Sequence, residues 1–308
     1  MADLRVVATG LGFPEGPIAM DDGSVVLVEI QRGTLTRVSA DGDVSVVAEC
    51  GGGPNGAAIG PDGKVYICNN GGFTWSTLEG FLIPGDKPDD YIGGRIQRVD
   101  LDTGEVETLY DSCDGAPLRG PNDLVFDTAG GFYFTDLGKG HSDTDTVDRG
   151  RVFYAQTDGS SVTQIAARMD HPNGCGLSPD GDRLYVAETL VGRLWWWNVR
   201  GPGQIEGGET FFGSGGANLL HGFEGFQFLD SLAVDSAGNV CVATILNGGV
   251  SVVSPDGELV DFVPVPDDVL VTNICFGGED LRTAYITSSG KGVLYATEWP
   301  RPGLKLNF

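Results

Sequence analysis

The chain has few positively charged residues. Its 308 residues include 19 Lys and Arg against 43 Asp and Glu, which gives a net charge of -24 and an isoelectric point near 4.2. A surface of this sign repels phosphate backbones and anionic lipid headgroups. We therefore expect neither nucleic acid nor a membrane surface as a partner, and we expect the acidic chain to attract cations.

Disulfide, secretion and membrane signals are absent as well. The six cysteines form no Cys-x-x-Cys pair, and most lie within apolar runs, where a thiol packs as a small hydrophobic group. Residues 1–9 have neither the basic segment nor the apolar core of a signal peptide. No apolar run approaches the ~20 residues that span a bilayer. These absences predict a cytoplasmic protein with reduced thiols.

The sequence also lacks an apolar stripe at helical spacing and a Gly-x-Ser-x-Gly motif. The first absence argues against a helical fold, and the second against a hydrolase with a serine nucleophile of that type. Glycine, in contrast, is abundant, with 49 residues and no Gly-x-x period. Glycine in this quantity indicates many tight turns between short strands.

An internal repeat organises the chain. Residues 171–188 hold a Pro-Asn-Gly triplet, a short apolar run, a Pro-Asp-Gly turn and an alternating strand. The same order recurs six times, at intervals of about 40 to 67 residues, close to or above the length of one propeller blade. One polar side chain opens each copy: Glu15, Asn55, Asn122, Asn173, Asp230 and Asn273.

The repeat predicts an all-β fold, with residues 1–308 forming a single six-bladed β-propeller of four-stranded antiparallel blades around a central metal-binding channel. Residues 4–8 are expected to supply the outer strand of the last blade and so close the ring. The longest insertion, at about 69–91, is predicted to overhang the channel as an aromatic lid. Trp75 in this insertion and His141 in the polar segment 137–149 are predicted to contact the substrate.

The six opening positions carry only carboxylates and amides, whereas a position that merely filled a core would be apolar. Converging oxygens of this kind form a site for a hard divalent cation such as Ca²⁺, Mg²⁺ or Mn²⁺. The alternative is a structural ladder in which each amide caps a turn or bonds to its neighbour. Glu15, Asn173 and Asp230 are the stronger ligand candidates, because prolines or aromatic residues around them fix the backbone.

Five motifs make the chain resemble a known family, that of senescence marker protein (regucalcin), gluconolactonase and luciferin-regenerating enzyme. They are Phe-Pro-Glu-Gly-Pro at 13–17, Gly-Pro-Asn-Asp-Leu at 120–124, Pro-Asn-Gly-Cys-Gly-Leu-Ser-Pro-Asp-Gly at 172–181, Tyr-Val-Ala-Glu-Thr at 185–189 and Asp-Ser-Leu-Ala-Val-Asp at 230–235. The resemblance implies one divalent metal ion. Ca²⁺ is the leading candidate, and Zn²⁺, Mn²⁺, Mg²⁺ and Fe²⁺ are alternatives.

The resemblance also implies roles for the opening residues. Glu15, Asn173 and Asp230 correspond to the metal ligands, and Asp230 also to the general base. Asn122 corresponds to a ligand or substrate contact, and we assign substrate contacts to Asn55, Asn122 and Asn273. The implied reaction is hydrolysis of a sugar lactone to an aldonic acid, with a metal-polarised carbonyl and an activated water. A phosphotriesterase-like hydrolase and a non-catalytic propeller that binds calcium or a protein partner remain alternatives.

Overall fold

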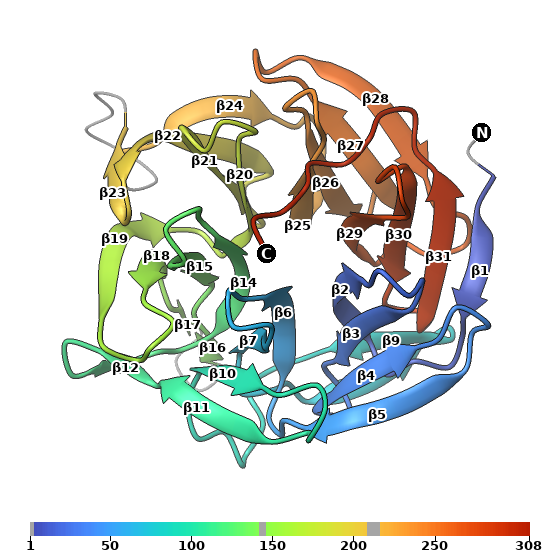
Figure 1. The fold of residues 1–308 in the computed structure, drawn as a ribbon, viewed down its shortest axis with the longest axis horizontal. Helices are drawn as coiled ribbons and strands as arrows, with labels where there is room; N and C mark the ends of the chain where they lie inside the picture. Colours follow the sequence, from blue (N-terminus) through green and yellow to red (C-terminus); the bar gives the residue numbers. More distant parts are fainter. Residues whose placement is uncertain (1–2, 142–145, 208–215) are drawn as a thin grey trace.

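A computed structural model describes residues 3–141, 146–207 and 216–308. In these ranges six antiparallel sheets stand around a common axis, with their strands roughly parallel to it (Figure 1). Each innermost strand contacts the innermost strands of both neighbouring sheets, so the contacts form a closed circle. The predicted six-bladed β-propeller is confirmed.

The blades share one order, in which the chain runs from the channel outward. The innermost strands are β2 (Pro14–Ala19), β6 (Pro54–Ile59), β14 (Pro121–Phe126), β20 (Pro172–Leu177), β25 (Phe228–Val234) and β29 (Val271–Gly277). The second strands are β3 (Val25–Glu29), β7 (Val65–Asn69), β15 (Phe132–Asp136), β21 (Arg183–Glu188), β26 (Val240–Ile245) and β30 (Thr283–Ser288). The third strands are β4 (Thr34–Val38), β10 (Arg95–Val99), β18 (Gly150–Ala155), β22 (Arg193–Gly201), β27 (Gly249–Val253) and β31 (Val293–Glu298).

Four blades end with an outer strand that follows directly in the chain. These strands are β5 (Val44–Glu49), β11 (Val106–Tyr110), β19 (Val162–Met169) and β28 (Leu259–Pro264). Blade four differs from the predicted four strands, because β22 pairs with both β23 (Gln204–Glu206) and β24 (Asn218–Gly222). The long strand β22 has room for two short partners along one edge, so this sheet has five strands.

Blade six takes its outer strand from the opposite end of the chain. Strand β1 (Arg5–Ala8) pairs antiparallel with β31, with Arg5 opposite Ala296 and Val6 opposite Tyr295. The pairing confirms that the N-terminal segment closes the ring. It also protects the edge of β31, whose backbone groups would otherwise lack partners.

Apolar side chains fill the six interfaces between blades. Successive residues of a strand point to opposite faces of the sheet, so Tyr66 and Cys68 of β7 pack toward blade three while Val65 and Ile67 pack toward blade one. Each of the six core clusters contains residues from two adjacent blades. All six cysteines are free thiols, as predicted, and five of them are buried.

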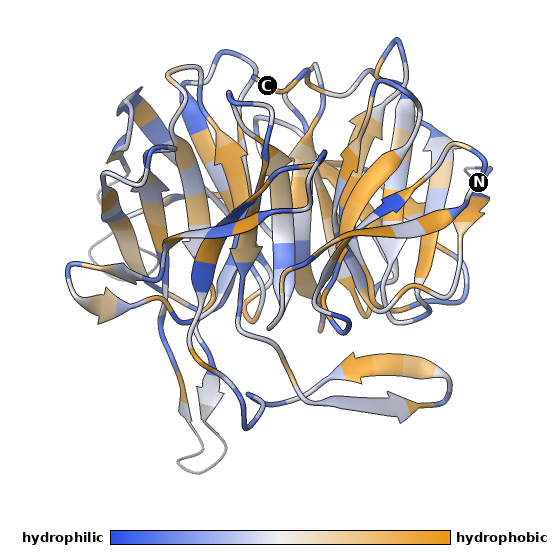
Figure 2. Ribbon diagram, turned by 60° about the horizontal axis from the view of Figure 1, so that its bottom comes forward, coloured by the Kyte–Doolittle hydropathy of each residue, from blue (hydrophilic) through white to orange (hydrophobic). Residues whose placement is uncertain are grey.

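Three small hairpins extend from one face of the ring, where the innermost strands begin. They are formed by β8 (Trp75–Leu78) with β9 (Phe81–Pro84), β12 (Ser112–Cys113) with β13 (Ala116–Pro117), and β16 (Gly140–His141) with β17 (Thr146–Val147). We call this the entry face. In Figure 2 the hairpin β8–β9 projects from the lower side of the ring, and the C-terminus lies on the opposite side.

The C-terminal segment crosses that opposite face and reaches the ring axis (Figure 1). The Leu304 amide donates to the Val234 carbonyl at 2.9 Å, and Asn307 Nδ2 donates to the Phe126 carbonyl at 2.8 Å. The Phe308 ring packs edge-on against Phe126, with 5.9 Å between centroids. These contacts bind the tail to blades five and three, so the face opposite the entry face is partly covered.

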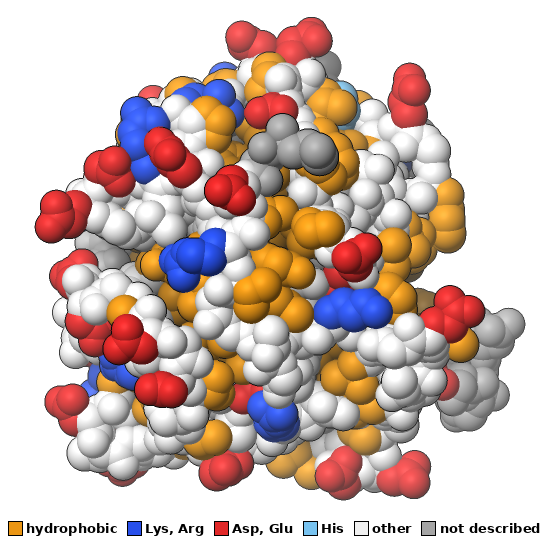
Figure 3. All heavy atoms as spheres, turned by 90° about the vertical axis from the view of Figure 1, so that its right-hand side faces the viewer, with side chains coloured by type: hydrophobic (Ala, Val, Ile, Leu, Met, Phe, Trp, Pro, Cys, Tyr) orange, Lys and Arg blue, Asp and Glu red, His pale blue; other side chains and the backbone are white. Residues whose placement is uncertain are grey.

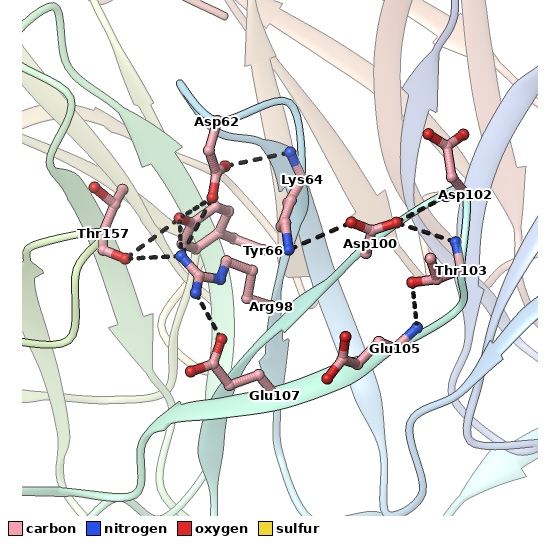
Figure 4. A network of polar contacts seen from close by, with 10 residues as sticks. All are labelled: Asp62, Lys64, Tyr66, Arg98, Asp100, Asp102, Thr103, Glu105, Glu107 and Thr157. Carbon is pink, nitrogen blue, oxygen red and sulfur yellow. Dashed lines mark hydrogen bonds and ion pairs between the residues drawn. The ribbon is translucent and has the colours of Figure 1, made fainter.

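Charges on the outside of the ring are dispersed. Acidic side chains are scattered over the flank around β1 and β31, with few basic ones among them (Figure 3). Where basic residues occur, they often lie in local networks such as that of Arg98, which bonds to Asp62 at 3.2 Å and Glu107 at 2.6 Å (Figure 4). In the described ranges no helix is long and apolar enough to cross a membrane.

Candidate active site

The six polar residues that open the repeats lie near the start of the innermost strands, at the entry face. Each is the second or third residue of its strand. In all six blades the pairing with the second strand shifts register at or next to this residue. Such a β-bulge bends the strand locally and changes the direction of its side chains. The bulges are therefore part of how the fold presents these groups.

Glycines after three of these residues let adjacent innermost strands approach closely. A Cβ on Gly16 would lie 2.6 Å from the Asn55 carbonyl oxygen, and one on Gly56 would lie 2.5 Å from the Asn122 carbonyl oxygen. A Cβ on Gly174 would lie 2.5 Å from the Leu232 amide nitrogen. Real Cβ atoms do not come this close to backbone, so the Glu-Gly and Asn-Gly pairs of the sequence narrow the centre of the ring.

Glu15 is buried, with an exposed fraction of 2%, and its two carboxylate oxygens have different surroundings. Its Oε2 accepts bonds from Asn273 Nδ2 at 2.7 Å and from the Gly16 amide at 2.8 Å. Its Oε1 is buried without a hydrogen-bond partner among the described residues. Burial raises the pKa of Glu15, and the bonds from Thr272, Asn273 and Gly16 act in the opposite direction.

Asp230 lies close to the other two predicted metal ligands. Its pKa is raised well above the ordinary value, first by burial and then by the negative charge of Glu15. A hydrogen bond with the Asn173 side chain partly offsets this rise. Glu15 and Asn173 therefore both lie within interaction distance of Asp230, and metal binding by the three stays a prediction. A carboxylate whose pKa is raised by the charge of a second carboxylate marks a favourable place for a positive charge.

Asn173 and Asn122 present amide groups to the same region. Asn173 Oδ1 accepts a bond from Ser231 Oγ at 3.4 Å, and its Nδ2 donates to Thr189 Oγ1 at 3.3 Å. Asn122 is 2% exposed, and its Oδ1 is buried with no partner in the described ranges. A buried polar atom without a partner costs free energy. The Asn122 oxygen is therefore a candidate ligand for a cation or a candidate acceptor for a substrate hydroxyl.

The remaining predicted residues have different surroundings. Asn273 Oδ1 accepts from the Ile274 amide at 2.8 Å, which orients the Asn273 side chain. Its Nδ2 then donates to Glu15 and fixes the position of that carboxylate. Asn55 is buried beside Gly16. Strand β16 pairs the backbone of His141 with that of Thr146, and the His141 side chain lies outside what the structure describes. Substrate contact by these residues stays a prediction.

Asp123 is a site residue that sequence reasoning missed. Its exposed fraction is 7%, and burial, aided by the charge of Glu15, raises its pKa to about 7. Its oxygens accept bonds from the Leu124 amide at 2.8 Å and the Cys175 amide at 3.4 Å. The signal was present in the sequence, because Asp follows the opening residue here where three other copies carry Gly.

Polar residues at the ends of second strands hold the loops that lead into the innermost strands. Glu29 accepts from the Gly12 amide at 2.5 Å, Asn69 from the Gly53 amide at 3.0 Å, and Asp136 from the Gly120 amide at 2.7 Å. Glu188 accepts from the Asp170 amide at 2.5 Å. These residues position the backbone of the site and do not belong to the group around Glu15.

The insertion at 69–91 crosses the entry face. Its hairpin starts beside blade two, passes blade one, where the Trp75 ring lies 5.2 Å from the Phe13 ring, and reaches blade six. There the Leu82 amide donates to the Gly290 carbonyl at 2.8 Å, and Lys291 Nζ lies 3.9 Å from the centroid of the Phe81 ring. Trp75 therefore packs against Phe13, which lies two residues before Glu15 in sequence. Substrate contact by Trp75 and a lid role for the insertion stay predictions.

The donor set decides what kind of ion the site could hold. No three His, Cys, Asp or Glu side chains in the described ranges lie close enough together to hold a metal ion. The group at the channel instead combines two carboxylates with amide oxygens, and it includes the unpartnered Oε1 of Glu15 and Oδ1 of Asn122. These residues fit an oxygen-binding divalent cation whose coordination includes neutral oxygens.

Comparisons with known proteins agree with the fold and the motifs. Residues 13–290 match the family model described as SMP-30/Gluconolactonase/LRE-like region. A gluconolactonase of Zymomonas mobilis is 25% identical over 316 residues, with 96% of this chain and 81% of the relative covered. Lactonase drp35 of Staphylococcus saprophyticus is 30% identical over 265 residues, with coverages of 85% and 72%. A solved gluconolactonase structure from Xanthomonas campestris has a TM-score of 0.75 at 22% identity, with coverages of 97% and 90%, which shows a shared fold.

Proposed function

Because the chain belongs to the SMP-30/gluconolactonase/LRE-like family, we propose that it hydrolyses a sugar lactone to the corresponding aldonic acid. Relatives along most of its length are named gluconolactonase and lactonase. The observation that supports the proposal is the closeness of Asp230 to Glu15 and to Asn173, together with a buried oxygen of Glu15 that has no partner in the described ranges. A propeller that served only as a scaffold would not need this group.

We further propose that one divalent cation binds to Glu15, Asn173 and Asp230, with Ca²⁺ as the leading candidate. Two carboxylates neutralise a divalent charge, and the amide oxygen of Asn173 adds a neutral ligand. When bound, such an ion supplies Lewis-acid polarisation of the lactone carbonyl and stabilisation of the oxyanion. Asn122 Oδ1 lies in the same region and is available to a ligand or to a substrate hydroxyl.

In this proposal a protein side chain carries out the proton transfers. In the proposed reaction a water oxygen bonds to the carbonyl carbon, and the bond from that carbon to the ring oxygen breaks. Asp230 accepts one proton of the attacking water and then donates it to the leaving ring oxygen, which becomes a hydroxyl. The products are one carboxylic acid and one alcohol on the same molecule, so atoms and charges balance. A carboxylate within reach of the water is suited to this step.

The test is a pH-indicator assay with gluconolactone, xylonolactone and a phosphotriester, with and without a chelator. We expect lactone turnover that is lost with the chelator and restored by one added divalent ion. Asp230→Asn and Glu15→Gln should abolish both activity and metal retention while leaving the protein folded. Asp261→Asn, which changes an exposed carboxylate on β28, serves as the matched control.

Each outcome of the assay assigns a function. Turnover of the phosphotriester with no turnover of lactones would replace the proposal with a phosphotriesterase-like activity. Metal binding without turnover of any substrate would favour a non-catalytic cation-binding propeller. Wild-type lactone turnover by both active-site variants would show that the residues are assigned wrongly.

A further inference from the structure

A cleft with a volume of about 320 Å³ lies at the outer part of blade three, on the entry face. Four arginines line it: Arg119 from the loop before β14, Arg149 and Arg151 at the start of β18, and Arg168 near the end of β19. We call it the arginine cleft. The chain has only 19 Lys and Arg in total and a net charge of -24, so four guanidinium groups around one cleft form a strong local departure from the overall charge.

The two aspartates of the arginine cleft are already engaged by backbone. Asp136 accepts from the amides of Arg119 at 2.8 Å, Gly120 at 2.7 Å and Gly138 at 2.9 Å. Asp148 Oδ2 accepts from the Lys139 amide at 3.2 Å. These carboxylates hold the walls of the cleft. Counted together with Asp170, the ion-pair partner of Arg149, they leave four positive charges against three negative ones.

The four guanidinium groups differ in their contacts within the described ranges. The charge of Arg151, which lies opposite Asp136 across β15 and β18, offsets part of the rise that burial causes in the pKa of Asp136. Arg149 forms an ion pair with Asp170. The guanidinium groups of Arg119, Arg151 and Arg168 make no hydrogen bond or ion pair with any residue that the structure describes. Positive groups that converge without partners repel each other, and an anion between them removes this repulsion.

Arg168 reaches the cleft through an unusual backbone conformation. Between β18 and β19 the register shifts, with Gly150 opposite Met169 and Arg151 opposite Ala167, so Arg168 is an extra residue in a β-bulge. Its φ of 68° lies in the left-handed region, which glycine adopts easily and arginine does not. A bulge changes the direction of its side chain. The conformation is unfavourable for arginine, and it places this side chain in the lining of the cleft.

We propose that the arginine cleft binds a phosphate group, either free or as the monoester of a small molecule. Arginine forks match the tetrahedral oxygens of phosphate, and each can form two parallel hydrogen bonds. The several oxygens of a phosphate can also accept hydrogen bonds from more than one guanidinium group at once. The carboxylates around Glu15 repel such a group, so it would stay in the cleft. This site is separate from the proposed lactone chemistry and does not depend on it.

The test is calorimetric titration of the purified protein with inorganic phosphate and, separately, with glucose 6-phosphate, at low ionic strength. Low salt is needed because added ions screen the attraction between the arginines and the anion and compete for the cleft. We expect saturable binding with a stoichiometry of one. Tighter binding of the sugar phosphate than of inorganic phosphate would identify the ester as the preferred form, and the reverse order would identify the free anion.

Arg168→Gly is the decisive variant, because glycine tolerates the left-handed backbone and the change removes the guanidinium without straining the fold. We expect this variant to bind phosphate at least about tenfold more weakly, as for loss of a charge-assisted hydrogen bond. Arg151→Gln should have a similar effect. Arg200→Gln, which changes an exposed arginine paired with Glu206 in blade four, is the control and should bind as the wild type does. Absence of saturable binding to the wild type, or equal affinity in Arg168→Gly, would overturn the proposal.

Discussion

Asn273 Nδ2 donates a hydrogen bond to Glu15 Oε2 at 2.7 Å, across 258 residues of sequence. The bond joins the innermost strand of the last blade to that of the first. It occupies one oxygen of Glu15 and leaves Oε1 without a partner among the described residues. Asn273 is therefore a positioning residue, which fixes the direction in which Glu15 presents its free oxygen.

Asn273→Ala should weaken metal retention and lower kcat/KM for the lactone by about 10- to 100-fold, the usual effect of removing a group that orients a metal ligand. The measurement is lactone turnover titrated with added metal. Activity that recovers at high metal concentration supports a positioning role. Asn218→Ala, in β24, is the control. If Asn273→Ala kept wild-type activity at every metal concentration, the positioning role would be excluded.

Trp75→Ala tests the insertion. The Trp75 ring packs 5.2 Å from Phe13, which directly precedes Pro14 and Glu15. Loss of this contact should loosen the hairpin β8–β9 beside blade one, and we expect a higher KM with a smaller change in kcat. Leu78→Ala, which changes an exposed residue of the same hairpin (62% exposed), should leave both constants unchanged. Identical kinetics for Trp75→Ala and wild type would show that the insertion is not a lid.

Gly174→Ala should destabilise the ring. The new Cβ would lie 2.5 Å from the Leu232 amide nitrogen in blade five, and backbone at this position cannot move without shifting two strands. Overpacking of this kind costs about 1–3 kcal/mol of unfolding free energy. Urea denaturation of Gly174→Ala and of Gly222→Ala, where a Cβ meets open space, measures the difference. Equal midpoints for the two variants would contradict the close approach of these strands.

Lys139 gives a prediction for pH. Its Nζ is buried between the Gly72 carbonyl, at 2.8 Å, and the Phe73 ring, 3.8 Å from the centroid, and burial lowers its pKa from 10.5 to about 7. Between pH 7 and 10.5 the unfolded chain therefore binds a proton that the folded chain does not. Stability from this group rises with pH in that window, by up to about 1.4 kcal/mol per unit, and is flat outside it.

The Lys139→Met variant lacks this contribution. We expect the unfolding free energy of the wild type, relative to that of the variant, to increase as the pH rises from 7 to 10. Parallel pH profiles of the two proteins in urea denaturation would show that Lys139 is charged in the fold throughout. Lys305→Met, at an exposed position in the C-terminal tail, controls for the loss of a lysine.

The repeat allowed much of this architecture to be predicted from sequence. Pro-Asn-Gly and Pro-Glu-Gly triplets, followed by Asp-Gly turns and alternating strands, indicated where each innermost strand begins and which residue opens it. The closure of the ring by residues 5–8 followed from the need of the last blade for an outer strand. The starts of the innermost strands and their opening residues are marked by short local motifs, and for this reason the repeat alone predicts them.

Asp123 and Arg168 could not be placed in this way. In a regular strand Asp123 would point away from its neighbour Asn122, but the register shift between Pro121 and Leu124 changes that alternation. Arg168 lies in the lining of the arginine cleft because of a bulge that no residue type in its segment announces. Lys139 packs against an insertion from another blade, so its burial depends on a contact between distant segments that carries no local signal.

The pairing of β1 with β31 sets the order in which the chain can finish folding. Residues 5–8 are synthesised before the whole of blades one to five, whereas their partner at 293–298 follows those blades. During synthesis β1 has an unpaired edge until β31 has been made, while the first five blades can already fold. A chain that stops short of residue 293 lacks β31. It therefore exposes two strand edges, that of β1 and that of β30.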